Sequence, residues 1–112
     1  MSGQFIKNID HKTILVMENL VQYQEGTVVS KTLAQSKAHS VTLFAFDKGE
    51  EISAHSAPGD ALVYILDGLA EITIGDEKFD VKKGETIVMS ANIPHALLAK
   101  ERFKMMLIVI FQ

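Results

Sequence analysis

The sequence predicts an all-β protein, a sandwich or barrel built from short antiparallel strands. The first observation is the spacing of glycines, which recur every seven to ten residues after Gly49 and lie in turn-forming contexts such as PGD at residues 58–60. The second is the composition of the intervening segments, which are short and rich in Val, Ile, Thr and Phe. Short strands separated by regularly spaced turns are typical of β-sandwiches and β-barrels.

Alternation within these segments identifies individual strands. In residues 69–74, Ala70 and Ile72 fall on one face, whereas Glu71 and Thr73 fall on the other. The segment KFDVK alternates in the same way. The predicted strands cover residues 27–34, 40–46, 50–54, 61–66, 69–74, 78–82, 86–89, 95–99 and 103–111.

The N-terminal quarter gives a weaker signal. Residues 13–24 read TILVMENLVQYQ, and their apolar positions do not settle between a helical and a strand period. We therefore expect a strand or an irregular arm here. At 112 residues the chain has the size of one domain, with a core barrel over about residues 26–112 and an N-terminal arm over residues 1–25.

Composition and charge exclude several classes of function. Apolar residues make up 47% of the chain and charged residues 22%, as in ordinary globular proteins. The 11 Lys and Arg residues are outnumbered by 14 Asp and Glu residues and form no basic patch, which argues against a nucleic-acid partner. Without Cys, the chain has neither disulfides nor thiolate chemistry. The N-terminus has no signal-peptide core and residues 105–111 are too few to span a bilayer, so we expect a cytoplasmic protein with no membrane partner.

The C-terminal segment FKMMLIVIF, residues 103–111, is almost continuously apolar. A strand that is apolar on both faces must be covered on both faces. Its second face could lie under the N-terminal arm or against a second copy of the chain. Because an uncovered patch of this kind promotes aggregation, the sequence favours a homodimer with residues 103–111 partly at the interface.

A set of glycines and histidines occurs with a characteristic spacing. Gly49 is followed after five residues by His55 and later by Gly68, and Gly84 precedes the triplet IPH at residues 93–95. Over residues 40–110 this pattern resembles the cupin superfamily, in particular its small single-domain "conserved barrel" type. The resemblance implies an antiparallel jelly-roll β-barrel, also called a double-stranded β-helix, which is usually dimeric.

The resemblance also implies where a metal ion would be held. The cupin motifs place metal ligands at His55 and His95, which match, and at two positions occupied here by Ala57 and Ala61 instead of a histidine and a glutamate. The metal motif is therefore degenerate. The proline, glycine and asparagine of the second motif are also replaced, by Ser90, Asn92 and Ala99.

Two histidines are too few to hold a divalent transition metal such as Zn, Fe, Mn or Ni firmly, because such ions need three or more protein ligands. Asp60 lies next to the vacant position, and the Pro58-Gly59 turn could swing its carboxylate inward as a third ligand. The alternative is that Asp60 is a polar turn residue, which is common after Pro-Gly.

The sequence places His55 and His95 in one pocket inside the barrel. Alternation puts Val63 and Ile65 on the face of Ala61, and Leu97 on the face of His95, so these side chains are predicted to bind a ligand with the imidazoles. A filled barrel core would have the same lining. Tyr64 falls on the opposite face. Neighbouring strands would contribute Leu43 or Phe44 and Met105 or Met106, and His11 and His39 are expected at the surface, with His39 alternatively at the barrel mouth.

The predicted function is the binding of a small organic molecule in the barrel, with weak or absent metal binding. An imidazole pair can bind a carboxylate or hydroxyl group. The alternative is an enzyme, either a metal-dependent oxygenase, isomerase or lyase, or a metal-free epimerase that uses a histidine as its base. The fold does not choose between them, because one fold supports many chemistries.

Overall fold

The computed structural model describes residues 5–111, so residues 1–4 of the predicted arm and residue 112 lie outside it. The described residues form one short 3-10 helix and seven strands that pair antiparallel. This confirms the predicted all-β jelly-roll barrel. The elements are η1 (Met17–Asn19), β1 (Val28–Gln35), β2 (His39–Phe46), β3 (Glu51–His55), β4 (Asp60–Ile74), β5 (Glu77–Lys82), β6 (Thr86–Met89) and β7 (His95–Ile110).

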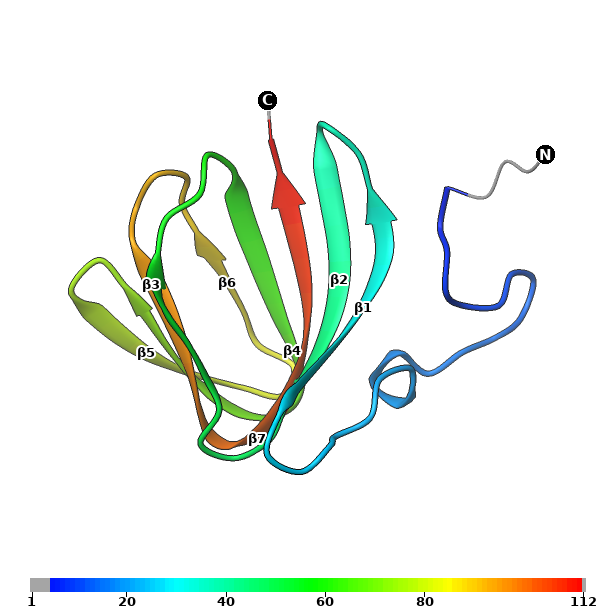
Figure 1. The fold of residues 1–112 in the computed structure, drawn as a ribbon, viewed down its shortest axis with the longest axis horizontal. Helices are drawn as coiled ribbons and strands as arrows, with labels where there is room; N and C mark the ends of the chain where they lie inside the picture. The colour runs from blue at the N-terminus through cyan, green and yellow to red at the C-terminus, as the bar shows by residue number, and fades with distance from the viewer. Residues whose placement is uncertain (1–4, 112) are drawn as a thin grey trace.

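Two long strands, β4 and β7, belong to both layers of the barrel (Figure 1). In one layer, the first part of β4 pairs with β6 and with the last part of β7, and β7 continues to β2 and β1. In the other layer, the last part of β4 pairs with β5 and with the first part of β7, and β7 continues to β3. One continuous β4–β7 ladder therefore joins the two layers.

The sequence predicted two strands in place of β4 and two in place of β7, and this division was wrong. The Asp67-Gly68 pair is not a hairpin turn, because the ladder with β7 continues through it with two register shifts. These shifts leave Leu66 and Leu69 without a register partner on β7. Such irregularities bend a strand without ending it, which is how β4 passes from one layer to the other.

Gly68 is required at this bend for two reasons. Its φ of +81° lies in the left-handed region that side chains disfavour. A Cβ at this position would also overlap the carbonyl oxygen of Arg102 on β7. The close approach of β4 and β7 therefore depends on the missing side chain.

The barrel interior is a packed apolar core. Phe46 stacks on Phe103 with ring centroids 4.4 Å apart, and Phe44 lies 6.1 Å from Phe46 in a tilted arrangement. Val63 and Ile65 are completely buried in the same cluster. This part of the barrel is filled by side chains, as the filled-core alternative predicted.

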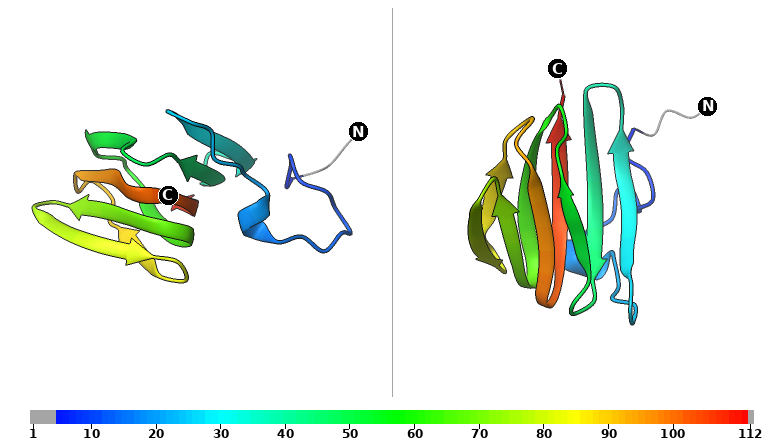
Figure 2. Two further views of the ribbon diagram at one scale, coloured as in Figure 1. Left: turned by 90° about the horizontal axis from the view of Figure 1, so that it is seen from below. Right: turned by 60° about the vertical axis from the view of Figure 1, so that its left-hand side comes forward.

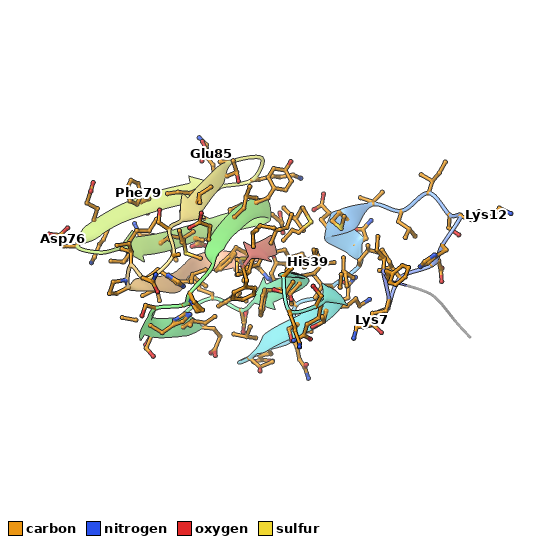
Figure 3. The ribbon with its side chains drawn as sticks, turned by 90° about the horizontal axis from the view of Figure 1, so that it is seen from above. Lys7, Lys12, His39, Asp76, Phe79 and Glu85 are labelled. Carbon is orange, nitrogen blue, oxygen red and sulfur yellow. The ribbon has the colours of Figure 1, made fainter. Side chains whose placement is uncertain are left out.

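The N-terminal segment before β1 is an arm and contains no strand in its described part. It lies on one side of the barrel (Figure 2), and Lys12 marks its far end (Figure 3). Val21 is buried in a second apolar cluster on the outer face of β1 and β2, with Leu33 and Leu43. Met106 of β7 packs against this cluster, so the arm covers part of the apolar outer face.

Polar contacts fasten the arm to the bend in β4. The Tyr23 hydroxyl donates a hydrogen bond to Asp67 Oδ2 at 2.6 Å, and the Arg102 guanidinium lies 3.9 Å from the centre of the Tyr23 ring. Burial, reinforced by the Asp67 carboxylate, raises the pKa of Tyr23 above its ordinary value. The buried Lys104 ammonium donates to the Glu18 carbonyl at 2.6 Å. Arm and barrel are thus joined by charge-assisted hydrogen bonds as well as by apolar packing.

Within residues 5–111, no helix is long and apolar enough to cross a membrane.

We expect Gly68→Ala to lower the free energy of unfolding by about 2 kcal/mol or more, because the left-handed backbone alone costs a side chain roughly 1–2 kcal/mol. The overlap with Arg102 adds to this cost. Gly84→Ala is the matched control, since Gly84 has a φ of +86° but no atom beyond its chain neighbours within 4 Å of the position that its Cβ would take. Urea unfolding of both variants measures the difference, and equal losses would contradict the proposed close approach.

The homodimer stays a prediction, and a partly exposed apolar strip on the outer face is the candidate surface for a second copy. Leu62 pairs with Val88 on one side and Ile108 on the other, outside both apolar clusters, and Val88 and Ile110 are 50% and 55% exposed. We expect sedimentation at micromolar concentrations to show a dimer that Ile108→Lys converts to a monomer. Phe79→Lys, on β5 (Figure 3), should leave the dimer intact. A purely monomeric wild type would overturn the prediction.

Candidate functional site

Two histidines from different strands lie side by side at one end of the barrel. His55 is the last residue of β3 and His95 is the first residue of β7, and the antiparallel register places them opposite each other. Their ring centroids are 4.4 Å apart, with the ring planes at 70°. The pairing of β3 with β7 therefore brings together two side chains that are 40 positions apart in the sequence.

Each ring is oriented by a backbone carbonyl two residues earlier in the chain. His55 Nδ1 lies 3.1 Å from the Ser53 carbonyl oxygen, and His95 Nδ1 lies 3.2 Å from the Ile93 carbonyl oxygen. Because a carbonyl oxygen can only accept, each Nδ1 carries a proton and donates it. In the neutral ring, Nε2 then holds a free lone pair.

Electrostatics favour the neutral form of His95. Burial is the largest effect and lowers the pKa of His95, and the neighbouring His55 lowers it further. The hydrogen bond to the Ile93 carbonyl acts in the opposite direction but is outweighed. His95 is only 5% exposed, so an added positive charge would be poorly solvated.

The two rings border a cavity of about 210 Å³ inside the barrel. Apart from the imidazoles, its wall is made of aliphatic, thioether and aromatic side chains, so a bound molecule would meet few polar groups. The lining residues are Phe44, Ile52, His55, Ala57, Ala61, Met89, His95, Leu97, Met105, Leu107 and Val109.

The predicted site residues divide into two groups. His55, His95 and Leu97 line the cavity, as do both alanines of the degenerate metal motif. Val63 and Ile65 share the inward face of β4 but are completely enclosed by the packed core and are not part of the cavity wall. Alternation identifies which face a residue occupies, but it does not identify how deep in the barrel the residue lies.

The two open choices in the pocket lining are settled by the strand faces. Phe44 and Met105 line the cavity, whereas Leu43 and Met106 belong to the cluster on the outer face. Alternation from Met105 would also have found Leu107 and Val109, which the sequence reasoning missed. Ile52 and Met89 were missed as well, because they come from β3 and β6, whose pairing partners the sequence does not reveal.

Asp60 lies outside the cavity, where it acts as a turn residue. Its side chain is exposed, and Oδ1 accepts a hydrogen bond from the Ala91 backbone N–H at 2.7 Å. The carboxylate therefore joins the start of β4 to the turn before β7. This arrangement agrees with the alternative in which Asp60 is a polar turn residue, since the hydrogen bond holds its carboxylate at the turn.

The other two histidines lie at the surface. His11 Nε2 is 2.6 Å from the Ile6 carbonyl oxygen within the arm. His39, labelled in Figure 3, begins β2, and its Nδ1 lies 3.2 Å from the Ser36 hydroxyl oxygen. It is not among the residues that line the cavity. Neither residue extends the site.

The donor set around the cavity does not fit a firmly bound metal ion. Among residues 5–111, no group of three or more His, Cys, Asp or Glu side chains is placed to hold one. Ala57 and Ala61 present methyl groups to the cavity, and methyl groups have no lone pair to donate. Two imidazoles alone fall short of the three or four protein ligands that zinc and iron sites use.

Comparison with known proteins gives a consistent family match. The family described as "Cupin domain" matches residues 42–111. A curated relative, an uncharacterized protein from Methanocaldococcus jannaschii, is 42% identical over 38 residues, which is 34% of this chain. That alignment spans 30% of the relative's length.

Solved structures extend the similarity to the whole fold. A conserved protein of unknown function from Streptococcus pyogenes is 48% identical, with a TM-score of 0.95 over 100% of this chain and 96% of that chain. A cupin superfamily protein from Desulfitobacterium hafniense is 36% identical, with a TM-score of 0.91 over 96% of this chain and 98% of that chain. A cupin 2 conserved barrel domain protein from Leptotrichia buccalis is 48% identical, with a TM-score of 0.82 over 83% of this chain and 45% of that chain.

If the alanines are what prevents metal binding, Ala57→His with Ala61→Glu should create a site of three histidines and one carboxylate. Without metal, the double variant should lose several kcal/mol of unfolding free energy, because it encloses polar groups in an apolar cavity. Added divalent metal should reverse this loss, since a ligand that binds only the folded state stabilises it.

Thermal unfolding with and without Zn²⁺, Mn²⁺ or Ni²⁺ measures the metal response. Wild type should respond little, and adding His55→Phe to the double variant should reduce the response. Equal responses in wild type and the double variant would show that the native pair already holds metal. A double variant without any response would show that the four positions do not converge.

Proposed function

Since the chain belongs to the family of cupin domains, we propose that its barrel binds a small organic molecule in the cavity beside His55 and His95, without a resident metal ion. The observation that carries the proposal is the cavity itself, about 210 Å³ with an apolar wall and two imidazoles. Concave, mostly apolar sites with a few convergent polar groups are the usual form of small-molecule sites.

The size of the cavity limits the ligand. Sites for drug-sized molecules occupy roughly 300–1,000 Å³, whereas an apolar cavity of about 150 Å³ accepts benzene. At about 210 Å³, this cavity suits a molecule of one substituted ring or a short branched chain. Nucleotides and disaccharides are too large for it.

The wall chemistry supports binding rather than catalysis. In catalytic triads the histidine base is oriented by a carboxylate, whereas here both imidazoles are oriented by backbone carbonyls. The cavity wall carries no titratable side chain besides the two histidines. A metal-dependent reaction lacks its donor set, and a metal-free reaction would have only the two imidazoles to act as acid and base.

The cavity should bind p-xylene, a rigid hydrocarbon that tests shape and apolar burial alone. Ala61→Met should weaken binding at least tenfold, because the longer side chain enters the cavity from β4. Ala38→Met, at an exposed alanine before β2, is the matched control and should bind as wild type does. NMR titration measures all three affinities. No saturable binding by wild type, or equal binding by Ala61→Met, would refute the proposed site.

A further inference from the structure

The free nitrogens of the two histidines define the polar part of the site. Each Nδ1 is occupied by a backbone carbonyl, which leaves Nε2, at the tip of the ring, as the nitrogen available to a ligand. Within residues 5–111, neither Nε2 has a hydrogen-bond partner. Both rings border the cavity, so a cavity ligand can reach them.

The Nε2 atom of His95 is accessible to a ligand. In the described part of the chain, every completely buried side-chain nitrogen or oxygen of a non-exposed residue has a hydrogen-bond partner. His95 is only 5% exposed and its Nε2 has no partner, so the small exposed part of the ring includes Nε2. A lone pair that faces an apolar cavity is an unsatisfied acceptor, and a ligand that donates a hydrogen bond to it is favoured.

Building on the proposed ligand-binding function, we propose that the site selects an uncharged molecule with a hydroxyl or N–H donor on a compact apolar body. The donor group donates a hydrogen bond to Nε2 of His55 or His95, and the body fills the space between Phe44, Met89 and Leu107. Both features of the ligand, its donor group and its apolar body, follow from the lining residues. The Nε2 atoms accept hydrogen bonds, and the remaining side chains offer only apolar contact.

An anionic ligand fits the same wall poorly. The cavity is lined by neither Lys nor Arg, so a carboxylate or phosphate would meet no permanent positive charge. Each Nε2 presents a lone pair, which repels an anionic oxygen. Moving an unpaired anion from water into an apolar cavity is costly. The lowered pKa of His95 agrees with this preference for neutral ligands.

The test uses three probes of similar shape: p-xylene, 4-methylphenol and 4-methylbenzoate. The first two differ only by the exchange of a methyl group for a hydroxyl donor. The ratio of their dissociation constants therefore reports the hydrogen bond separately from apolar burial. When the accepting nitrogen is removed, we expect the affinity for 4-methylphenol to fall about tenfold relative to the affinity for p-xylene. A hydroxyl donor left unpaired in the cavity weakens binding by that much or more.

The variants are His95→Phe and His55→Phe, which replace the imidazole with an aromatic ring that lacks Nε2. His55 is exposed, so His55→Phe provides a folded variant even if His95→Phe is unstable. His39→Phe is the matched control, since His39 is an exposed histidine outside the cavity. The shift should occur in at least one cavity variant and not in the control.

The outcomes separate this inference from the function on which it rests. An unchanged ratio in both cavity variants and in the variant that combines them, or tighter binding of 4-methylbenzoate than of 4-methylphenol, would overturn the donor selectivity while leaving the ligand site intact. Failure of p-xylene to bind wild type would overturn the site itself, and the selectivity with it.

Discussion

The continuous ladder between β4 and β7 is the interaction on which the rest of the structure depends, because every other strand pairs with it directly or through one neighbour. The ladder serves both layers only if its apolar side stays inward through the bend. On β7 the inward residues have the same parity on both sides of the bend, as at Leu97 and Met105, whereas β4 is inward at Val63 before Gly68 and at Ile72 after it. The register shift at Leu66 absorbs the extra residue of β4 that would otherwise turn one half of the strand outward.

The candidate site is a consequence of where this ladder and its neighbour β3 end. β3 is short and pairs with β7 alone, and its last residue, His55, meets the first residue of β7, His95. The core is filled around the stacked rings of Phe46 and Phe103, while the space beside the histidines is lined partly by Ala57 and Ala61. The cavity therefore exists because small side chains occupy positions that could have carried larger polar ones.

The sequence predicted the fold well because turn chemistry and alternation are local properties. It failed at Gly68, where the same dipeptide signal that marks a turn marks a bulge instead, and only the approach of Arg102 from a distant strand distinguishes the two. In the site, spacing led to His55 and His95, and alternation led to Leu97. The depth of a residue in the barrel was not predictable, so Val63 and Ile65 were assigned to a pocket wall although packed neighbours enclose them. The hydrogen bond that holds Asp60 also depends on a tertiary contact, with Ala91, that no local pattern contains.

The two histidines retain an arrangement that serves either a metal or an organic ligand. In metal sites, a ligating imidazole commonly donates its other N–H to a carbonyl or carboxylate, which fixes the ring and leaves one lone pair for the ion. Here Ser53 and Ile93 supply those carbonyls, so the orientation of both rings does not depend on what occupies the cavity. The difference lies at Ala57 and Ala61. With a histidine and a glutamate there, the lone pairs would belong to a charged, four-ligand set, whereas with methyl groups they are isolated acceptors in an apolar wall, and a neutral donor is the partner that satisfies them without introducing a charge.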